Sequence, residues 1–85
     1  MPGCPPITFN GVTQEAWDCL KSRALGVGVR IVGDSGSASV QGLTIDIRRD
    51  PRANTLTLNV QAPTGAPCGE IARKLREAVA VCGVS

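Results

Sequence analysis

The sequence predicts an α+β fold, a two-layer domain in which two helices pack on one face of a three-stranded antiparallel meander. Two segments carry apolar residues at helical spacing, one in the N-terminal third and one at the C-terminus. Between them, apolar and polar residues alternate with a period of two in runs that short turns separate. Strands joined by short turns pair antiparallel, so the predicted order is α-β-β-β-α.

Length and composition describe one domain with a small core. The chain has 85 residues, of which 42% are hydrophobic and 19% are charged, as in globular proteins. Its only large aromatic residues are one Trp and one Phe, so the core depends on Val, Ile, Leu and Ala. We expect residues 7–83 to form a single domain after an irregular segment at 1–6. We also expect added stability from a disulfide, a metal or a second copy of the chain.

The first helix is predicted over residues 13–25. Before it, Ile7-Thr8-Phe9 is a candidate for a short extra strand that ends at the turn-forming pair Asn10-Gly11. Thr13 is a good N-cap, and Glu15 places a negative charge in the first turn of the helix. The apolar face of this helix carries Ala16, Trp17, Leu20 and Ala24, and Gly26 follows as a stop signal.

Three strands are predicted in the middle of the chain. The first holds Val27, Val29 and Ile31, and a turn at residues 33–36 follows it. The second runs over residues 40–48, and its alternation slips by one residue at Gln41-Gly42, which predicts a β-bulge there. The third, over residues 55–61, alternates most regularly. Its two faces consist of Leu56, Leu58 and Val60 on one side and Thr55, Thr57, Asn59 and Gln61 on the other.

A second helix is predicted to begin near Cys68 and to end at Gly83. Pro67 suits the first position of a helix and Glu70 suits the first turn. One narrow stripe at helical spacing holds Cys68, Ile71, Leu75, Ala78, Val79 and Cys82. Because both helices are amphipathic, they cover only the apolar face of the sheet, and the other face is expected to lie in water.

The predicted order of one helix, three strands and one helix is similar to that of double-stranded RNA-binding domains. That family binds RNA through a lysine-rich start to its second helix and a basic loop between its first two strands. Here those positions read Pro67-Cys68-Gly69-Glu70 and Gly33-Asp34-Ser35-Gly36-Ser37, which are acidic and neutral. The resemblance therefore concerns the fold alone, and it implies no RNA-binding residue in this chain.

The sequence lacks a complete catalytic set, so we predict no enzymatic activity and no cofactor. It has no His, which removes the commonest general base and the commonest metal ligand. Gly33-Asp34-Ser35-Gly36 is a string of the kind found in serine hydrolases, but without a His it is interpreted as a hairpin turn. Asp34, Asp46 and Asp50 are close in sequence, but no cleft is predicted to hold two of them together.

The four cysteines, Cys4, Cys19, Cys68 and Cys82, are candidates for reactive or disulfide-bonded thiols. Cys68 and Cys82 are about 21 Å apart on one helix, which excludes a bond between them and a zinc site of all four thiols. Feasible disulfides join Cys4 or Cys19 to one of them. Cys68 begins a helix, where thiolates are stabilised, so a thiol-based redox or metal-responsive function centred on Cys68 is an alternative.

Two groups of basic residues are candidates for anion binding. They are Arg48, Arg49 and Arg52 around one turn, and Arg73, Lys74 and Arg76 on the outer face of the second helix. The net charge of +2 is small and acidic residues lie between the basic ones, which argues against nucleic acid as the partner. Weak binding of nucleic acid or another anion is the second alternative.

We expect a small non-enzymatic protein-interaction or structural module, with a protein partner that is either another protein or a second copy. The candidate interaction surface is the polar face of the third strand, which consists of Thr55, Thr57, Asn59 and Gln61. Pairing of that strand, as a sheet edge, with its counterpart in a second copy would give a homodimer with a continuous sheet.

The sequence indicates no membrane partner. No apolar run approaches the length of a membrane-spanning helix. The N-terminus, residues 1–6, lacks the positive and then apolar pattern of a signal peptide. We therefore expect a cytoplasmic protein.

Overall fold

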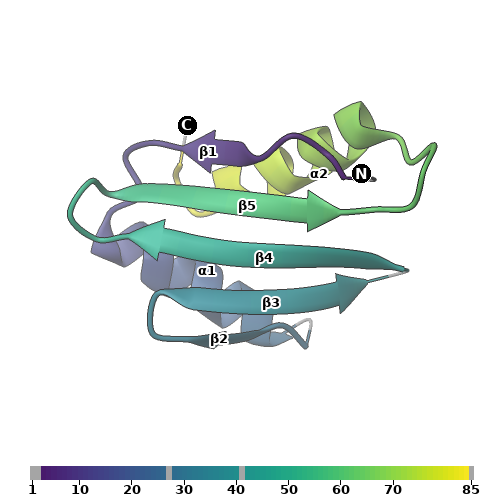
Figure 1. Cartoon of the computed structure of the whole chain (residues 1–85). Coiled ribbons are helices and arrows are strands. Elements are labelled where there is room, and N and C mark those ends of the chain that lie inside the picture. Colours follow the sequence, from purple (N-terminus) through teal and green to yellow (C-terminus); the bar gives the residue numbers. More distant parts are fainter. Residues whose placement is uncertain (1–2, 27, 41, 85) are drawn as a thin grey trace.

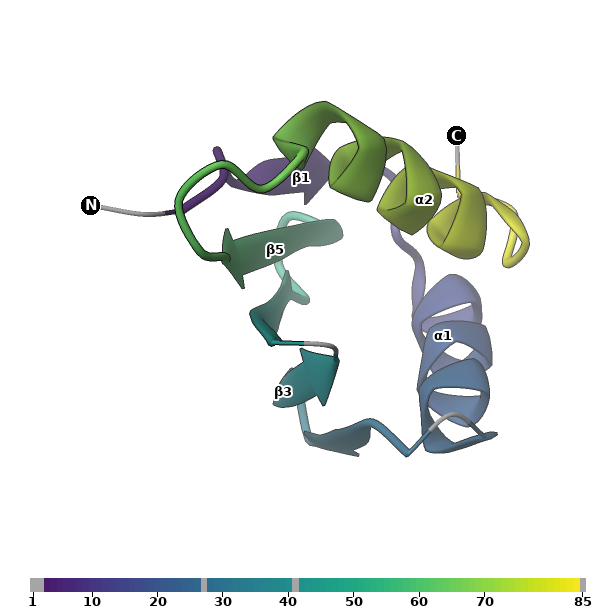
Figure 2. The ribbon, with the colours of Figure 1, turned by 90° about the vertical axis from the view of Figure 1, so that its right-hand side faces the viewer.

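The computed structural model describes residues 3–26, 28–40 and 42–84. Two helices pack on one face of a five-stranded antiparallel sheet with the order β1-β5-β4-β3-β2 (Figures 1 and 2). The elements in chain order are β1 (Ile7–Phe9), α1 (Gln14–Gly26), β2 (Arg30–Val32), β3 (Ser35–Val40), β4 (Leu43–Asp50), β5 (Thr55–Gln61) and α2 (Cys68–Ala80). The α+β class is confirmed, whereas the three-stranded meander understates the sheet by two strands.

The strand predicted over residues 40–48 with a bulge holds the last residue of β3 and most of β4. β3 and β4 form a hairpin whose last pair is Val40 with Leu43, and Gly42 in the connection has a φ of +81°. The slip in the alternation therefore marks a turn. β3 could not be recognised in the sequence, because its serines, glycine and alanine give almost no alternation of apolar and polar residues. Gln41, the other residue of the proposed bulge, and Val27, proposed to begin the first strand, lie outside the described residues.

Two short strands form the edges of the sheet. The candidate strand over Ile7–Phe9 is β1, which pairs antiparallel with β5 from Leu58 to Leu56. At the other edge, β2 forms a hairpin with β3 through a turn at Gly33-Asp34, which is shorter than predicted. Gly36 permits this close approach, because a Cβ there would lie 2.7 Å from the Arg30 carbonyl oxygen.

Both helices begin close to their predicted starts. The Thr13 hydroxyl accepts a hydrogen bond from the Ala16 N–H at 3.3 Å, as expected of an N-cap, and α1 starts at the next residue. Pro67 occupies the N-cap position of α2 and so precedes the helix by one residue. Of the irregular segment predicted at 1–6, residues 1 and 2 lie outside the described chain, and the Cys4 N–H donates to the Val60 carbonyl at 3.0 Å.

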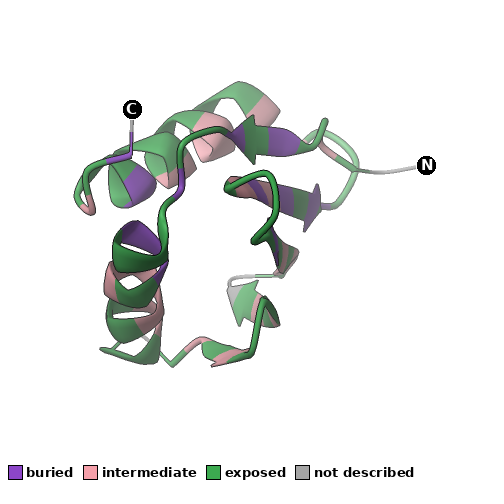
Figure 3. Cartoon of the chain, turned by 90° about the vertical axis from the view of Figure 1, so that its left-hand side faces the viewer, coloured by how far each residue is buried: buried purple, intermediate pink, exposed green. Residues whose placement is uncertain are grey.

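The core lies at one end of the molecule. Figure 3 shows buried residues on β1, β5, the beginning of α1 and the end of α2. The largest fully buried side chains are Trp17, Leu56 and Val12. The last turns of α1 and the described residues of β2 and β3 are only half-buried or exposed. The sheet is therefore covered tightly near β1 and β5 and loosely near β3 and β2.

Arg49 is buried in this core and ties four segments together. Its side chain is on the helix-covered face of β4, opposite Leu56, and the residue is only 4% exposed. Nε and Nη2 donate to the Val12 carbonyl at 3.3 and 3.2 Å, and Nη2 also donates to Asn54 Oδ1 at 3.0 Å. Nη1 donates to Gln14 Oε1 at 3.3 Å and lies 3.8 Å from Asp34 Oδ1. The guanidinium thus links β4 to the start of α1 and to two turns.

The Arg49→Met variant is expected to lower the free energy of unfolding by about 3 kcal/mol, because it leaves buried polar partners unpaired. Urea unfolding followed by Trp17 fluorescence measures this change. The control is Arg48→Met, which alters the neighbouring exposed residue on the other face of β4 and should cost no more than about 0.5 kcal/mol. Equal effects of the two substitutions would contradict the assigned role of Arg49.

Candidate functional site

Part of the helix-facing side of the sheet carries apolar residues that the helices leave incompletely covered. The register places Ile47 beside Leu58 and Ile45 beside Val60, and both of these β5 residues are buried. The sheet residues on the same face towards β2 are only half-buried. They are Ile31, Ala38, Ile45 and Ile47. Half-exposed apolar side chains on an inner face indicate a space between the two layers.

An apolar cavity of about 550 Å³ occupies this space. Its floor is the sheet from β2 to β5, and its walls come from α1 and α2. The lining consists of Trp17, Leu20, Arg23, Ala24, Gly26, Val29, Ile31, Ala38, Ile45, Ile47, Leu56, Leu58, Leu75, Ala78 and Val79. Its volume falls in the range of about 300–1,000 Å³ that small-molecule sites in proteins show. The site is therefore large enough for a ligand of ordinary metabolite size.

Three attachments fix α1 around the cavity. At its start, Arg49 holds Val12 and Gln14. In its middle, a disulfide joins Cys19 to Cys82, which follows α2. At its end, α1 is joined to β2 by a short connection, in which the Val29 N–H caps the helix by donating to the Ala24 carbonyl at 2.8 Å. Figure 2 shows this arrangement of the ribbon, in which α2 and α1 lie along the same side of the sheet.

Small side chains keep the enclosed space open. Ala24 and Gly26 line it from α1, Ala38 from β3 and Ala78 from α2. Larger apolar residues at these positions would fill the volume from three directions. Since empty apolar volume is costly in a protein core, an apolar space of this size is more typical of a binding site than of a packed core.

The cavity has a single charge at its wall. Among the described lining residues, Arg23 is the only charged one. The structure shows no hydrogen bond or ion pair of its side chain with any residue in 3–26, 28–40 or 42–84. Trp17 also lines the cavity, and its Nε1 has no hydrogen-bond partner within the described chain. The site therefore combines apolar walls with one unpaired cation.

All four cysteines are in disulfides. Cys4 is bonded to Cys68 and Cys19 is bonded to Cys82, so each bond joins the N-terminal part of the chain to α2 or its end. Each bond joins Cys4 or Cys19 to one of the two cysteines of the second predicted helix, as the cysteine spacing predicts. A disulfide sulfur is neither a nucleophilic thiolate nor a metal ligand. A thiol function centred on Cys68 would therefore require prior reduction of its bond.

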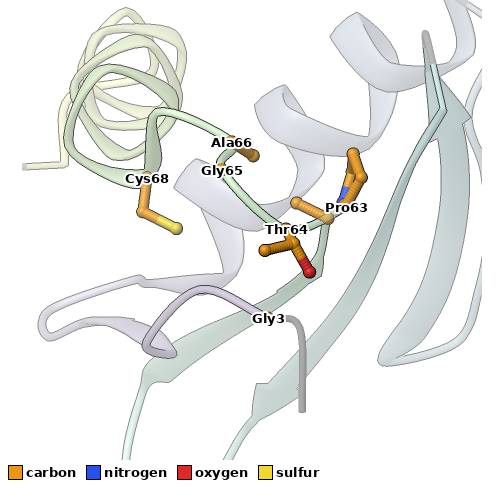
Figure 4. A pocket seen from close by; sticks show the side chains of 7 residues that line it. Gly3, Pro63, Thr64, Gly65, Ala66 and Cys68 are labelled. Atoms are coloured by element: carbon orange, nitrogen blue, oxygen red, sulfur yellow. The ribbon is translucent and has the colours of Figure 1, made fainter.

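A second, smaller pocket of about 360 Å³ lies beside the Cys4–Cys68 bond (Figure 4). It is formed by Gly3, the connection from Ala62 to Ala66, and Cys68. None of its described lining residues carries a charge, and its sulfur is bonded. This pocket offers a ligand little beyond the Thr64 hydroxyl and backbone groups, so the apolar cavity is the stronger candidate.

The structure does not gather the basic candidates into one patch. Arg49 is in the core and its guanidinium is already engaged, which corrects its placement among surface anion contacts. Arg48 is on the sheet face that the helices leave open. Arg73 pairs with Glu70 at 3.4 Å and Glu77 at 2.9 Å on the exposed side of α2. Arg52 is in the turn after β4, and Lys74 and Arg76 are exposed on α2.

The polar residues of β5 lie on the sheet face away from the helices, as predicted for a strand with one apolar and one polar face. Thr55 and Thr57 are half-buried, and Asn59 and Gln61 are exposed. The proposed edge pairing of this strand is wrong, because β5 is central and pairs with both β1 and β4. A homodimer with a continuous sheet would have to use β1 or β2.

The three aspartates are spread over different parts of the fold. Asp34 pairs with Arg49, and Asp46 lies on the open sheet face opposite Asn59. The Asp50 carboxylate accepts hydrogen bonds from the Arg52 and Ala53 N–H groups at 2.9 and 3.4 Å, which stabilises the turn after β4. The helix-three strands-helix order that resembles RNA-binding domains is also incomplete, because β1 precedes α1 and β2 is a separate edge strand.

Sequence reasoning assigned the large cavity residues to the core and missed that they enclose a space. Leu20, Leu75 and Ile31 were recognised as apolar-face residues, but their pattern cannot distinguish a packed face from a cavity wall. The available signal was the series of alanines on those faces, Ala24 and Ala78 in the helices and Ala38 in β3.

No family model, curated protein or solved structure matches this chain. The fold and the site alone define its class, a small disulfide-bonded α+β domain with an apolar cavity. Within the described residues, no helix has the length and apolar character needed to cross a membrane.

Native protein treated with an alkylating agent is expected to gain no mass, even after denaturation, because both disulfides occupy all four sulfurs. Reduction before alkylation should add four labels. Serine replacement of both Cys19 and Cys82 should lower the free energy of unfolding by about 4 kcal/mol, since the bond closes a long loop. Labelling without reductant would contradict the pairing.

Proposed function

We propose that this chain is a non-enzymatic binding module that holds an apolar small molecule in the cavity between α1 and the sheet. The observation that supports this function is the 550 Å³ space with an almost entirely apolar lining. Burial of apolar ligand surface against that lining would be favourable in proportion to the area removed from water. A bound ligand would also complete the core where the last turns of α1 stand over β3 and β4.

The binding site of the expected interaction module is then the cavity rather than the polar strip of β5. The polar strip of Thr55, Thr57, Asn59 and Gln61 lies on the sheet face that the helices leave open, and none of its residues lines the cavity. The cavity, by contrast, is lined by the sheet and by both helices and has one unpaired charge. We therefore place binding at the cavity and expect the polar strip to be solvated sheet surface.

The two disulfides support a location in an oxidising compartment. Disulfides persist in secreted, periplasmic and cell-surface proteins, whereas thiols of cytosolic proteins are kept reduced. The cytoplasmic location expected from the sequence is not supported by the structure, in which both disulfides are formed. Protein isolated with its thiols blocked during lysis should retain both bonds if this location is right.

Titration with the neutral apolar dye N-phenyl-1-naphthylamine tests the binding function. Trp17 is the only Trp in the chain and lines the cavity, so its fluorescence reports occupancy directly. We expect saturable, one-to-one dye binding with transfer of excitation from Trp17 to the dye. The absence of saturable binding to the native, oxidised protein would contradict the proposal.

Filling the cavity should weaken dye binding without loss of stability. Ala38→Leu places a larger side chain on the sheet floor and is expected to weaken binding at least about tenfold, with stability unchanged or raised by about 1 kcal/mol. The matched control is Ala80→Leu, which adds the same side chain at an exposed position of α2 outside the cavity lining. Equal dye affinity in both variants would place the dye elsewhere.

A further inference from the structure

We propose that the natural ligand is a single unbranched acyl chain that ends in a carboxylate, with the chain in the cavity and the carboxylate on Arg23. This inference rests on the proposed function, since it names the chemical class that the cavity accepts. It follows from the position of Arg23, the chemistry of the remaining lining and the size of the space.

Arg23 is placed to bind an anionic head group at the wall of the cavity. It lies in the last turn of α1, is exposed, and belongs to the cavity lining. The neighbouring Arg30 cannot share this role, because it alternates with the lining residue Ile31 and so lies on the opposite face of β2. A guanidinium presents a planar pair of N–H donors that matches a carboxylate in a bidentate pair.

The remaining lining suits an alkyl chain. Away from Arg23, the described side chains of the wall are Leu, Ile, Val, Ala and the indole of Trp17. None of them supplies a hydroxyl, carboxamide or carboxylate that could orient a polar ligand. A ligand with several hydroxyl or amide groups would therefore lose hydrogen bonds to water without replacement, which disfavours sugars, nucleosides and peptides.

The size of the cavity favours one chain over a helix of a partner protein. A methylene group occupies about as much space as a water molecule, roughly 30 Å³, so the volume holds at most about eighteen such groups. Two turns of a helix about 10 Å across would occupy roughly 800 Å³, so a partner helix could lie only partly within the cavity. α1 cannot swing away to admit a helix while Cys19 is bonded to Cys82.

Calorimetric titration of the oxidised full chain with decanoate, dodecanoate and dodecan-1-ol, all below their aggregation limits, tests the inference. Dodecanoate is expected to bind at least about tenfold more tightly than dodecan-1-ol, because only the acid pairs with Arg23. Dodecanoate should also exceed decanoate by about fifteenfold, as two additional methylene groups are buried.

Two arginine variants locate the head group. Arg23→Gln should remove the preference for the acid over the alcohol and leave alcohol binding unchanged. Arg76→Gln is the matched control, since Arg76 is exposed on α2 and does not line the cavity. It should bind dodecanoate as the unaltered chain does. Because Arg23 has no described partner within the protein, the Arg23→Gln variant should unfold at the same urea concentration.

The outcomes separate the two proposals. Equal binding of acid and alcohol, or equal loss in the two arginine variants, would overturn the acyl carboxylate and leave an apolar site. Failure of dodecanoate, dodecan-1-ol and the naphthylamine dye to bind would overturn both proposals. Sedimentation of the ligand-free chain as a dimer that dodecanoate does not dissociate would assign the apolar walls to a second copy instead.

Discussion

The attachment of α1 at both ends and in its middle determines what the rest of this small domain can do. Arg49 holds the entry to the helix through Val12 and Gln14, and the Cys19–Cys82 bond holds its centre to the end of α2. A helix with one apolar face would otherwise settle onto β3 and β4 and bury Ile45 and Ile47. Since its attachment points are fixed, the last turns of α1 remain over the sheet without closing on it, and the cavity is the consequence.

A domain of this size gains little stability from its core, so an unfilled apolar space needs compensation elsewhere. Two disulfides that each close a loop of more than sixty residues provide it, because they restrict the unfolded chain without occupying core volume. The buried guanidinium contributes in a different way, since it fixes geometry by donating to the Val12 carbonyl and the Asn54 side chain rather than by filling space. The disulfides and Arg49 thus stabilise the fold without filling the cavity, whereas Trp17, Leu56, Leu58 and Val79 belong both to the core and to the cavity walls.

The helices and β5 could be predicted because their signals are local: the Thr13 cap, the stripe from Cys68 to Cys82 and the alternation of residues 55–61. β3 could not be predicted, because its small side chains give no alternation of apolar and polar residues. The short strand β1 was only a candidate in the sequence, and its pairing with β5 establishes it. Arg49 looked like its neighbour Arg48 in the sequence, and only the register shows that the two lie on opposite faces of β4. The cavity depends on the distance between two layers, a quantity that no local pattern encodes.

The distance between the two layers also gives the unpaired Arg23 its importance, because it leaves an apolar wall beside the guanidinium. An arginine on the outer surface of a helix interacts weakly with passing anions, because water screens it. Arg23 lies at the junction of solvent and an apolar wall, where an anion can keep part of its hydration while its apolar portion leaves water. Neither contribution alone would select a ligand, since the wall accepts any apolar group and the guanidinium accepts any anion. Their juxtaposition at the end of α1 selects molecules that carry both, which is the property that distinguishes this cavity from a packing defect.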